Sequence, residues 1–89
     1  MIKNTLSDQQ KRLIFRSWHR GTREMDLILG SFAEKHLPGY DDARIAEYER
    51  LLVNNDPDLY NWYTGRESVP EEENSLVMQD FLRHKVAGQ

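Results

Sequence analysis

The chain of 89 residues carries twelve lysines and arginines, fifteen aspartates and glutamates, three histidines and no cysteine, for a net charge of −3. The lack of cysteine excludes disulfides, a thiolate nucleophile and cysteine-ligated zinc, and the lack of an apolar run of about 18 residues argues against membrane insertion. A chain this short forms a single domain, which we assign to residues 1–89 with its core over about residues 7–86. Residues 1–12 resemble neither a secretory signal nor a transit peptide, so we expect a bacterial cytoplasmic protein, or a mitochondrial matrix protein after processing.

The charge is distributed unevenly along the chain. Residues 1–23 carry six lysines and arginines against one aspartate, whereas residues 24–89 carry six against fourteen acidic residues. The acidic remainder argues against general nucleic-acid binding, although the basic first segment leaves a small nucleic-acid-binding regulator as a minor alternative.

The first predicted helix covers residues 7–20. Ser7 and Gln10 form a capping box at its start, and Gly21 is suited to end it. Its apolar side is expected to comprise Leu13, Ile14 and Trp18, with Phe15 as a further candidate.

Two longer amphipathic helices follow. The spacing of three and four residues between apolar positions predicts a second helix over residues 23–36 and a third over residues 41–54, with Asp41 as its N-cap. The apolar positions are Met25, Ile28, Leu29, Phe32, Ala33 and Leu37, then Ile45, Tyr48, Leu51 and Leu52.

The last two predicted helices are shorter. Asp56 is expected to cap the fourth helix, with Pro57 at its first position and Gly65 after its end. Residues 71–73, three glutamates after Pro70, suit the positive end of a fifth helix. Their inward-facing residues are expected to be Leu59, Trp62 and Tyr63, then Leu76, Val77, Phe81 and Leu82. Because no segment alternates with period two, the sequence predicts an all-α bundle of five helices.

No residues form a recognisable catalytic or metal-binding pattern. His19, His36 and His84 fall on three different predicted helices, and neither a nucleophile motif nor a glycine-rich phosphate loop occurs. We therefore assign no catalytic, cofactor-binding or metal-binding residue and expect a protein that is not an enzyme.

Positive charge gathers where the first two helices meet. Arg16, His19, Arg20 and Arg23 surround Gly21, and Glu24 follows within one turn. Helix capping and the helix dipole explain each residue type separately. They do not explain the clustering, so a docking surface is the alternative, with Gly21 allowing close approach and Arg20 offering a planar fork of donors.

The aromatic residues also allow two interpretations. At helical spacing in a small bundle they are expected to be core residues rather than a ring-stacking site. Trp62, close to Tyr60, is a further candidate for an interface anchor.

Two blocks of the sequence resemble the SdhE family. The first is "RGTRE" at residues 20–24, which resembles that family's R-G-x-x-E motif and continues into "MDLILGSF". The second is "YERLLVNNDPDLYNWYTGRESVP" at residues 48–70, and the resemblance as a whole spans about residues 12–83. Members are small assembly factors that help attach FAD covalently to a histidine of the succinate dehydrogenase flavoprotein and of related fumarate reductases. The resemblance implies a five-helix fold and a chaperone-like helper.

The resemblance also implies which residues matter. Arg20, Gly21 and Glu24 match the motif, and Met25 and Asp26 continue it; with Trp62 they are the predicted partner-binding residues. Further matches are Phe32, Leu52, Asp56 and Leu59, whereas Thr22, Arg23 and Tyr63 depart from residues common in the family.

The predicted function is therefore assembly of the succinate dehydrogenase flavoprotein, and of the related fumarate reductase, by docking through the corner formed by Arg20, Gly21 and Glu24. The alternative is a generic helical adaptor without a flavoprotein client. We expect a monomer when free, no nucleic-acid partner, and no FAD bound tightly by the chain itself, because no nucleotide-binding fingerprint is present.

Overall fold

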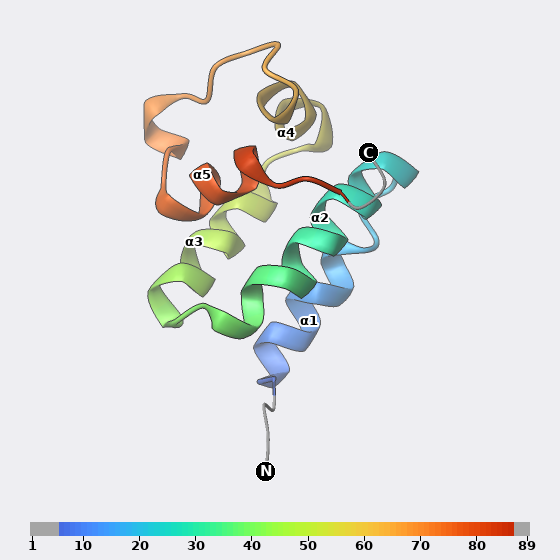
Figure 1. Cartoon of the computed structure of the whole chain (residues 1–89), viewed down its shortest axis with the longest axis vertical. Coiled ribbons are helices and arrows are strands. Elements are labelled where there is room, and N and C mark those ends of the chain that lie inside the picture. The colour runs from blue at the N-terminus through green and yellow to red at the C-terminus, as the bar shows by residue number, and fades with distance from the viewer. Residues whose placement is uncertain (1–5, 87–89) are drawn as a thin grey trace.

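The computed structural model describes residues 6–86, and these form a bundle of α-helices joined by short connections (Figure 1). Within this part of the chain there are five α-helices, two 3-10 helices and no strand, so the prediction of an all-α five-helix fold is confirmed. The elements are α1 (Asp8–Ser17), α2 (Arg23–His36), η1 (Leu37–Gly39), α3 (Asp42–Val53), α4 (Asp56–Tyr63), η2 (Glu71–Glu73) and α5 (Leu76–Arg83). None of the helices in residues 6–86 has the length and apolar character needed to cross a membrane.

Each α-helix begins at a polar side chain that accepts a hydrogen bond from a backbone N–H of the first turn. The predicted capping box at Ser7 and Gln10 is present in both directions, and Asp41 caps α3 as predicted. These caps satisfy N–H groups that have no acceptor within the helix. The full set of caps is Ser7, Thr22, Asp41, Asn55 and Ser75.

The cap of α4 corrects the prediction by one residue. Asn55, not Asp56, accepts the hydrogen bond from the Asp58 N–H, at 2.9 Å, and Pro57 follows within the first turn. Asp56 is the first residue inside α4, and its carboxylate binds the side chain of Arg20.

The start of the fifth helix was also predicted wrongly. Residues 71–73 form the separate 3-10 helix η2, and α5 begins only at Leu76, where the Ser75 hydroxyl accepts from the Met78 N–H. Asn74 between them is extended, which ends one helix before the next begins. Leu76 therefore occupies the first turn with 60% of its surface exposed instead of facing the core.

At α1 the helix ends earlier than expected. Its last residue is Ser17, so His19 and Arg20 lie in the connection to α2. Phe15 points away from the core, with 64% of its surface exposed.

The core lies between two packed pairs of helices. The antiparallel helices α1 and α2 form one pair, and α3 with α5 forms the other, while α4 packs against α5 (Figure 1). The buried apolar residues come from every α-helix and from η1: Leu13, Met25, Ile28, Leu29, Phe32, Ala33, Leu37, Ile45, Tyr48, Leu51, Leu52, Leu59, Trp62, Val77, Met78 and Phe81.

Two polar contacts, one buried and one partly buried, connect the pairs. Ser17 donates to the Leu13 carbonyl at 2.7 Å and its oxygen lies 2.6 Å from the Tyr48 hydroxyl, joining α1 to α3. After α5, the chain crosses α2, where His84 Nε2 lies 2.8 Å from Ser31 Oγ (Figure 1). Both contacts satisfy polar groups that burial would otherwise leave without partners.

Candidate functional site

The connection between α1 and α2 has a backbone shape that requires glycine. Gly21 has a φ of +127°, a conformation that residues with a side chain rarely adopt. A Cβ atom placed there would have no atom within 4 Å, so the outer side of the loop is open. Gly21 is thus needed for the conformation of the turn, and its exposed backbone leaves room for another molecule to approach closely.

Asp26 holds this turn against the start of α2. Its Oδ1 accepts a hydrogen bond from the Arg20 N–H at 2.6 Å and a longer one from the Gly21 N–H at 3.3 Å. A carboxylate in the first turn of a helix is also favoured by the helix dipole. Asp26 therefore has a role within the fold, in fixing the path of the loop.

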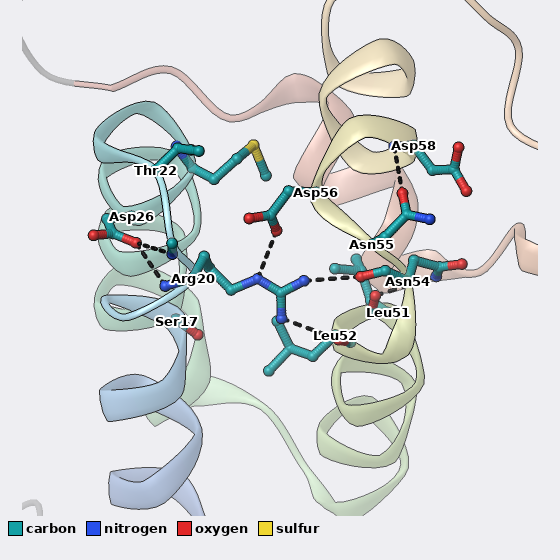
Figure 2. A network of polar contacts seen from close by, with 12 residues as sticks. Ser17, Arg20, Thr22, Asp26, Leu51, Leu52, Asn54, Asn55, Asp56 and Asp58 are labelled. Carbon is teal, nitrogen blue, oxygen red and sulfur yellow. Dashed lines mark hydrogen bonds and ion pairs between the residues drawn. The ribbon is translucent and has the colours of Figure 1, made fainter.

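The side chain of Arg20 points into the molecule, between the α1–α2 connection and the junction of α3 with α4 (Figure 2). Its Nε donates to Asp56 Oδ1 at 2.9 Å. One terminal nitrogen donates to the Leu52 carbonyl at 3.0 Å, and the other donates to the Asn54 carbonyl at 2.8 Å. All three nitrogens of the guanidinium are thus engaged inside the chain.

These contacts explain why an arginine is suited to this position. The carbonyls of Leu52 and Asn54 lie at the C-terminal end of α3, where carbonyls lack helical partners and a cation is favoured. The planar fork binds both of them and Asp56 at once, which a lysine cannot do. The side chains of Arg20 and Asp56 are only 14% and 18% exposed, so water screens the pair weakly.

Glu24 lies in the first turn of α2 and is exposed to solvent. No hydrogen bond or ion pair joins its carboxylate to any residue in the described range 6–86, and Asp56 is the carboxylate that holds Arg20. The two charged residues of the R-G-x-x-E motif therefore do different things: Arg20 binds the fold, and Glu24 faces outward.

Glu24 borders a shallow, mainly apolar depression between the starts of α2 and α4. The depression has a volume of about 260 Å³. It is lined by Thr22, Glu24, Met25, Asp56, Pro57 and Tyr60. An apolar hollow with a carboxylate at its edge can receive an apolar side chain or stem together with a hydrogen-bond donor.

The structure brings five of the six predicted partner-binding residues to this region. Arg20, Gly21 and Asp26 share hydrogen bonds, while Glu24 and Met25 line the depression. Trp62 is apart from them, in the core, with 8% of its surface exposed. The aromatic side chain at the depression is Tyr60.

Sequence reasoning missed Pro57 and Tyr60 as site residues and assigned Asp56 a local capping role. The sequence did contain a signal for the contact between Asp56 and Arg20. Arg20 belongs to the first block that resembles the family, and Asp56 belongs to the second. Two opposite charges in two such blocks suggest contact between them.

The described residues contain no group of three or more histidine, aspartate or glutamate side chains placed to hold a metal ion. The groups gathered at the α1–α2 loop are an internally bound guanidinium, a free carboxylate and an apolar depression. Such an arrangement suits binding of another surface.

Comparison with known proteins agrees on one family. The model of the family described as "flavinator of succinate dehydrogenase" matches residues 11–85, which include both the loop and the depression. The mitochondrial succinate dehydrogenase assembly factor 2-A of Drosophila willistoni is 37% identical over 81 residues, covering 89% of this chain and 52% of that protein. The mitochondrial succinate dehydrogenase assembly factor 2 of Dictyostelium discoideum is 35% identical over 86 residues, covering 93% of this chain and 61% of that protein. The chain thus spans about half the length of curated relatives that it matches.

Proposed function

Because the chain belongs to the family of succinate dehydrogenase flavinators, the SdhE family, we propose that it is an assembly factor that promotes covalent attachment of FAD to the succinate dehydrogenase flavoprotein. The structural observation in its favour is the exposed carboxylate of Glu24 at the edge of an apolar depression, beside a loop that Arg20 holds rigidly. A rigid surface binds with little loss of conformational entropy, which favours a docking role.

The proposed docking surface comprises the outer side of Gly21, the carboxylate of Glu24 and the depression over Met25, Pro57 and Tyr60. The apolar depression supplies contact area, and Glu24 supplies a charge-assisted hydrogen bond to a donor on the flavoprotein. Arg20 and Asp26 act as positioning residues that keep this surface in shape.

The chain is proposed to act by holding its client, without forming bonds itself. Binding shifts the flavoprotein toward the domain arrangement that places the flavin beside the acceptor histidine. Such a helper shifts the equilibrium only by its difference in affinity for the two arrangements. Holding two groups in position can supply much of the rate of their reaction.

The FAD involved belongs to the client, and we propose that the chain binds none tightly itself. The related fumarate reductase flavoprotein is a second proposed client. The relatives are named as mitochondrial proteins, and the bacterial cytoplasm is our proposal for this chain.

The test measures covalent flavin on the flavoprotein, by fluorescence on a denaturing gel, with the chain absent, present, or replaced by Glu24→Gln. Glu24→Gln keeps the size of the side chain and removes a charge that no described residue uses. We expect flavin attachment to depend on the chain. The Glu24→Gln variant should bind the flavoprotein about ten- to a hundredfold more weakly, because it loses one charge-assisted hydrogen bond.

The matched control is Glu67→Gln, a second exposed glutamate, in the segment between α4 and η2. It should behave as the wild type does. Equal fluorescence in all lanes, with no complex on gel filtration, would reject the proposed function and favour the generic adaptor.

A further inference from the structure

The outward side of α1 presents cations around an exposed aromatic ring. Lys11, Arg12, Phe15, Arg16 and His19 are all exposed, and their spacing of three and four residues places them on one side of the helix and its continuation. We call these five residues the α1 outer face. Its opposite side packs against α2 (Figure 1).

Phe15 stands at the centre of the α1 outer face in a fixed position. The ring is 64% exposed and stacks on the His19 ring, with centroids 4.0 Å apart. His19 is held in turn, because its Nδ1 lies 2.7 Å from the Phe15 carbonyl. Hollows lie on both sides of Phe15, and arginines line each of them. Aromatic and arginine side chains are enriched at protein interfaces.

The cations of this face are not neutralised within residues 6–86. The ion pairs of that range are Arg20–Asp56, Arg44–Glu47 and Arg83–Asp80, and none involves Lys11, Arg12 or Arg16. Neighbouring like charges on a helix repel each other, so the repulsion among Lys11, Arg12 and Arg16 opposes what Arg16 gains from the helix dipole in the last turn of α1. An acidic partner would relieve the repulsion.

The α1 outer face is continuous with the docking surface around Glu24. Arg20 lines the hollow beside Phe15 and His19, and its ion-pair partner Asp56 lines the depression beside Glu24. One partner can therefore cover both surfaces across the Arg20–Asp56 pair.

We propose that the α1 outer face is a second docking surface that binds a carboxylate-rich patch on the same flavoprotein, an inference that rests on the proposed function. The basic face steers the approach of the acidic patch, and Phe15 then packs against it. Charges of this kind act mainly on the association rate, whereas a buried aromatic acts mainly on the dissociation rate.

A protein partner fits these observations better than a nucleic acid or a membrane does. Residues 24–89 carry fourteen acidic side chains against six basic ones, which repel a long polyanion. The α1 outer face has one apolar side chain, too few for membrane binding by an amphipathic helix.

The test measures association and dissociation rates on the immobilised flavoprotein over a series of salt concentrations. Arg12→Gln/Arg16→Gln should lower the association rate by about tenfold at low salt and weaken its salt dependence. The control Arg50→Gln/Arg66→Gln removes two other exposed charges, and Arg50 matches Arg16 in lying in the last turn of a helix. Phe15→Ser should raise the dissociation rate by about tenfold, whereas Val53→Ser, at a residue 83% exposed on α3, should not.

The outcomes separate the two proposals. If the folded wild type does not bind the flavoprotein, the proposed function fails and this inference fails with it. If all variants bind like the wild type, the inference is overturned and the proposed function stands. If the α1 variants lose binding only to duplex DNA or to phosphatidylserine vesicles tested in parallel, the acidic protein partner is also overturned.

Discussion

At the scale of single residues, Arg20 joins distant parts of the chain, since it and its partner Asp56 are 36 residues apart in sequence. Its loss leaves an aspartate and two carbonyls at the end of α3 without their donor. We expect Arg20→Ala to lower the free energy of unfolding by about 2–3 kcal/mol, and Arg20→Lys to lower it less, because an ammonium reaches fewer of the three acceptors. Urea unfolding followed by circular dichroism measures the change.

The neighbouring Arg23 provides the control for this prediction. It is exposed at the first position of α2, and no described residue binds its side chain. Arg23→Ala should stay within about 0.5 kcal/mol of the wild type. An Arg20→Ala variant as stable as Arg23→Ala would show that the guanidinium does not hold the junction together.

The role of Arg20 was not predictable from sequence, whereas that of Ser7 was. Ser7 bonds a residue three positions away, and such local patterns can be read directly from the chain. Besides Asp56, Arg20 binds two backbone carbonyls at the end of another helix, which any residue can supply. The sequence therefore identified the corner formed by Arg20, Gly21 and Glu24, but it predicted that Arg20 binds a partner protein.

At the scale of elements, the packing of α1 on α2 depends on Gly30. Its Cα faces the indole of Trp18, and a Cβ atom there would overlap the ring. The ring is fixed by a 2.8 Å hydrogen bond from Trp18 Nε1 to Glu34. We expect Gly30→Ala to lower the free energy of unfolding by about 1–3 kcal/mol, although alanine favours helices more than glycine does.

The same substitution in a Trp18→Ala background tests the reason. With the indole gone, Gly30→Ala should be neutral or should stabilise by up to about 1 kcal/mol, as helix propensity alone predicts. A destabilisation of equal size in both backgrounds, measured by urea unfolding, would exclude the clash as its cause.

Helices α2 and α3 were predictable from apolar spacing, but the limits of the shorter helices were not. Several polar residues near each of these helices could serve as the cap. Ser75 caps α5, five residues after Pro70, and Asn55 caps α4 in place of Asp56. Phe15 also fits the helical stripe by spacing, and only the position of α2 shows that it faces outward.

At the scale of the whole molecule, the fold brings together two histidines that sequence placed on separate helices. His36 ends α2 and His84 follows α5, and their ring centroids lie 6.1 Å apart. Ser31 donates its hydrogen to the Leu27 carbonyl and so accepts from His84 Nε2. The Nδ1 of His84 is buried without a partner in the described chain, which suits the neutral ring.

Both histidines therefore favour the neutral form in the folded state. Burial lowers the pKa of His84, and the nearby His36 and Lys35 lower it further. Burial also lowers the pKa of His36, with Lys35 adding to the shift and Asp80 opposing it. These two histidines take up protons at higher pH in the unfolded chain than in the folded one. The stability that the neutral histidines contribute to the fold is therefore complete above the ordinary pKa of 6.5. It is lost as the pH falls below 6.5 through the lowered pKa values of the folded state.

We expect the urea midpoint to fall between about pH 7.5 and about pH 5.5, and the fall to be smaller in His84→Gln. Glutamine keeps a hydrogen-bond donor for Ser31 but does not take up a proton. In His84 the second proton would bind at Nδ1, which is buried without a partner in the described chain, and the charge of Lys35 opposes it. The control is His19→Gln, which removes an exposed histidine in the connection between α1 and α2 and leaves the pair of His36 and His84 in place. If His84→Gln and the wild type lose the same stability over this range, protonation of the buried histidine pair is not what couples the fold to pH.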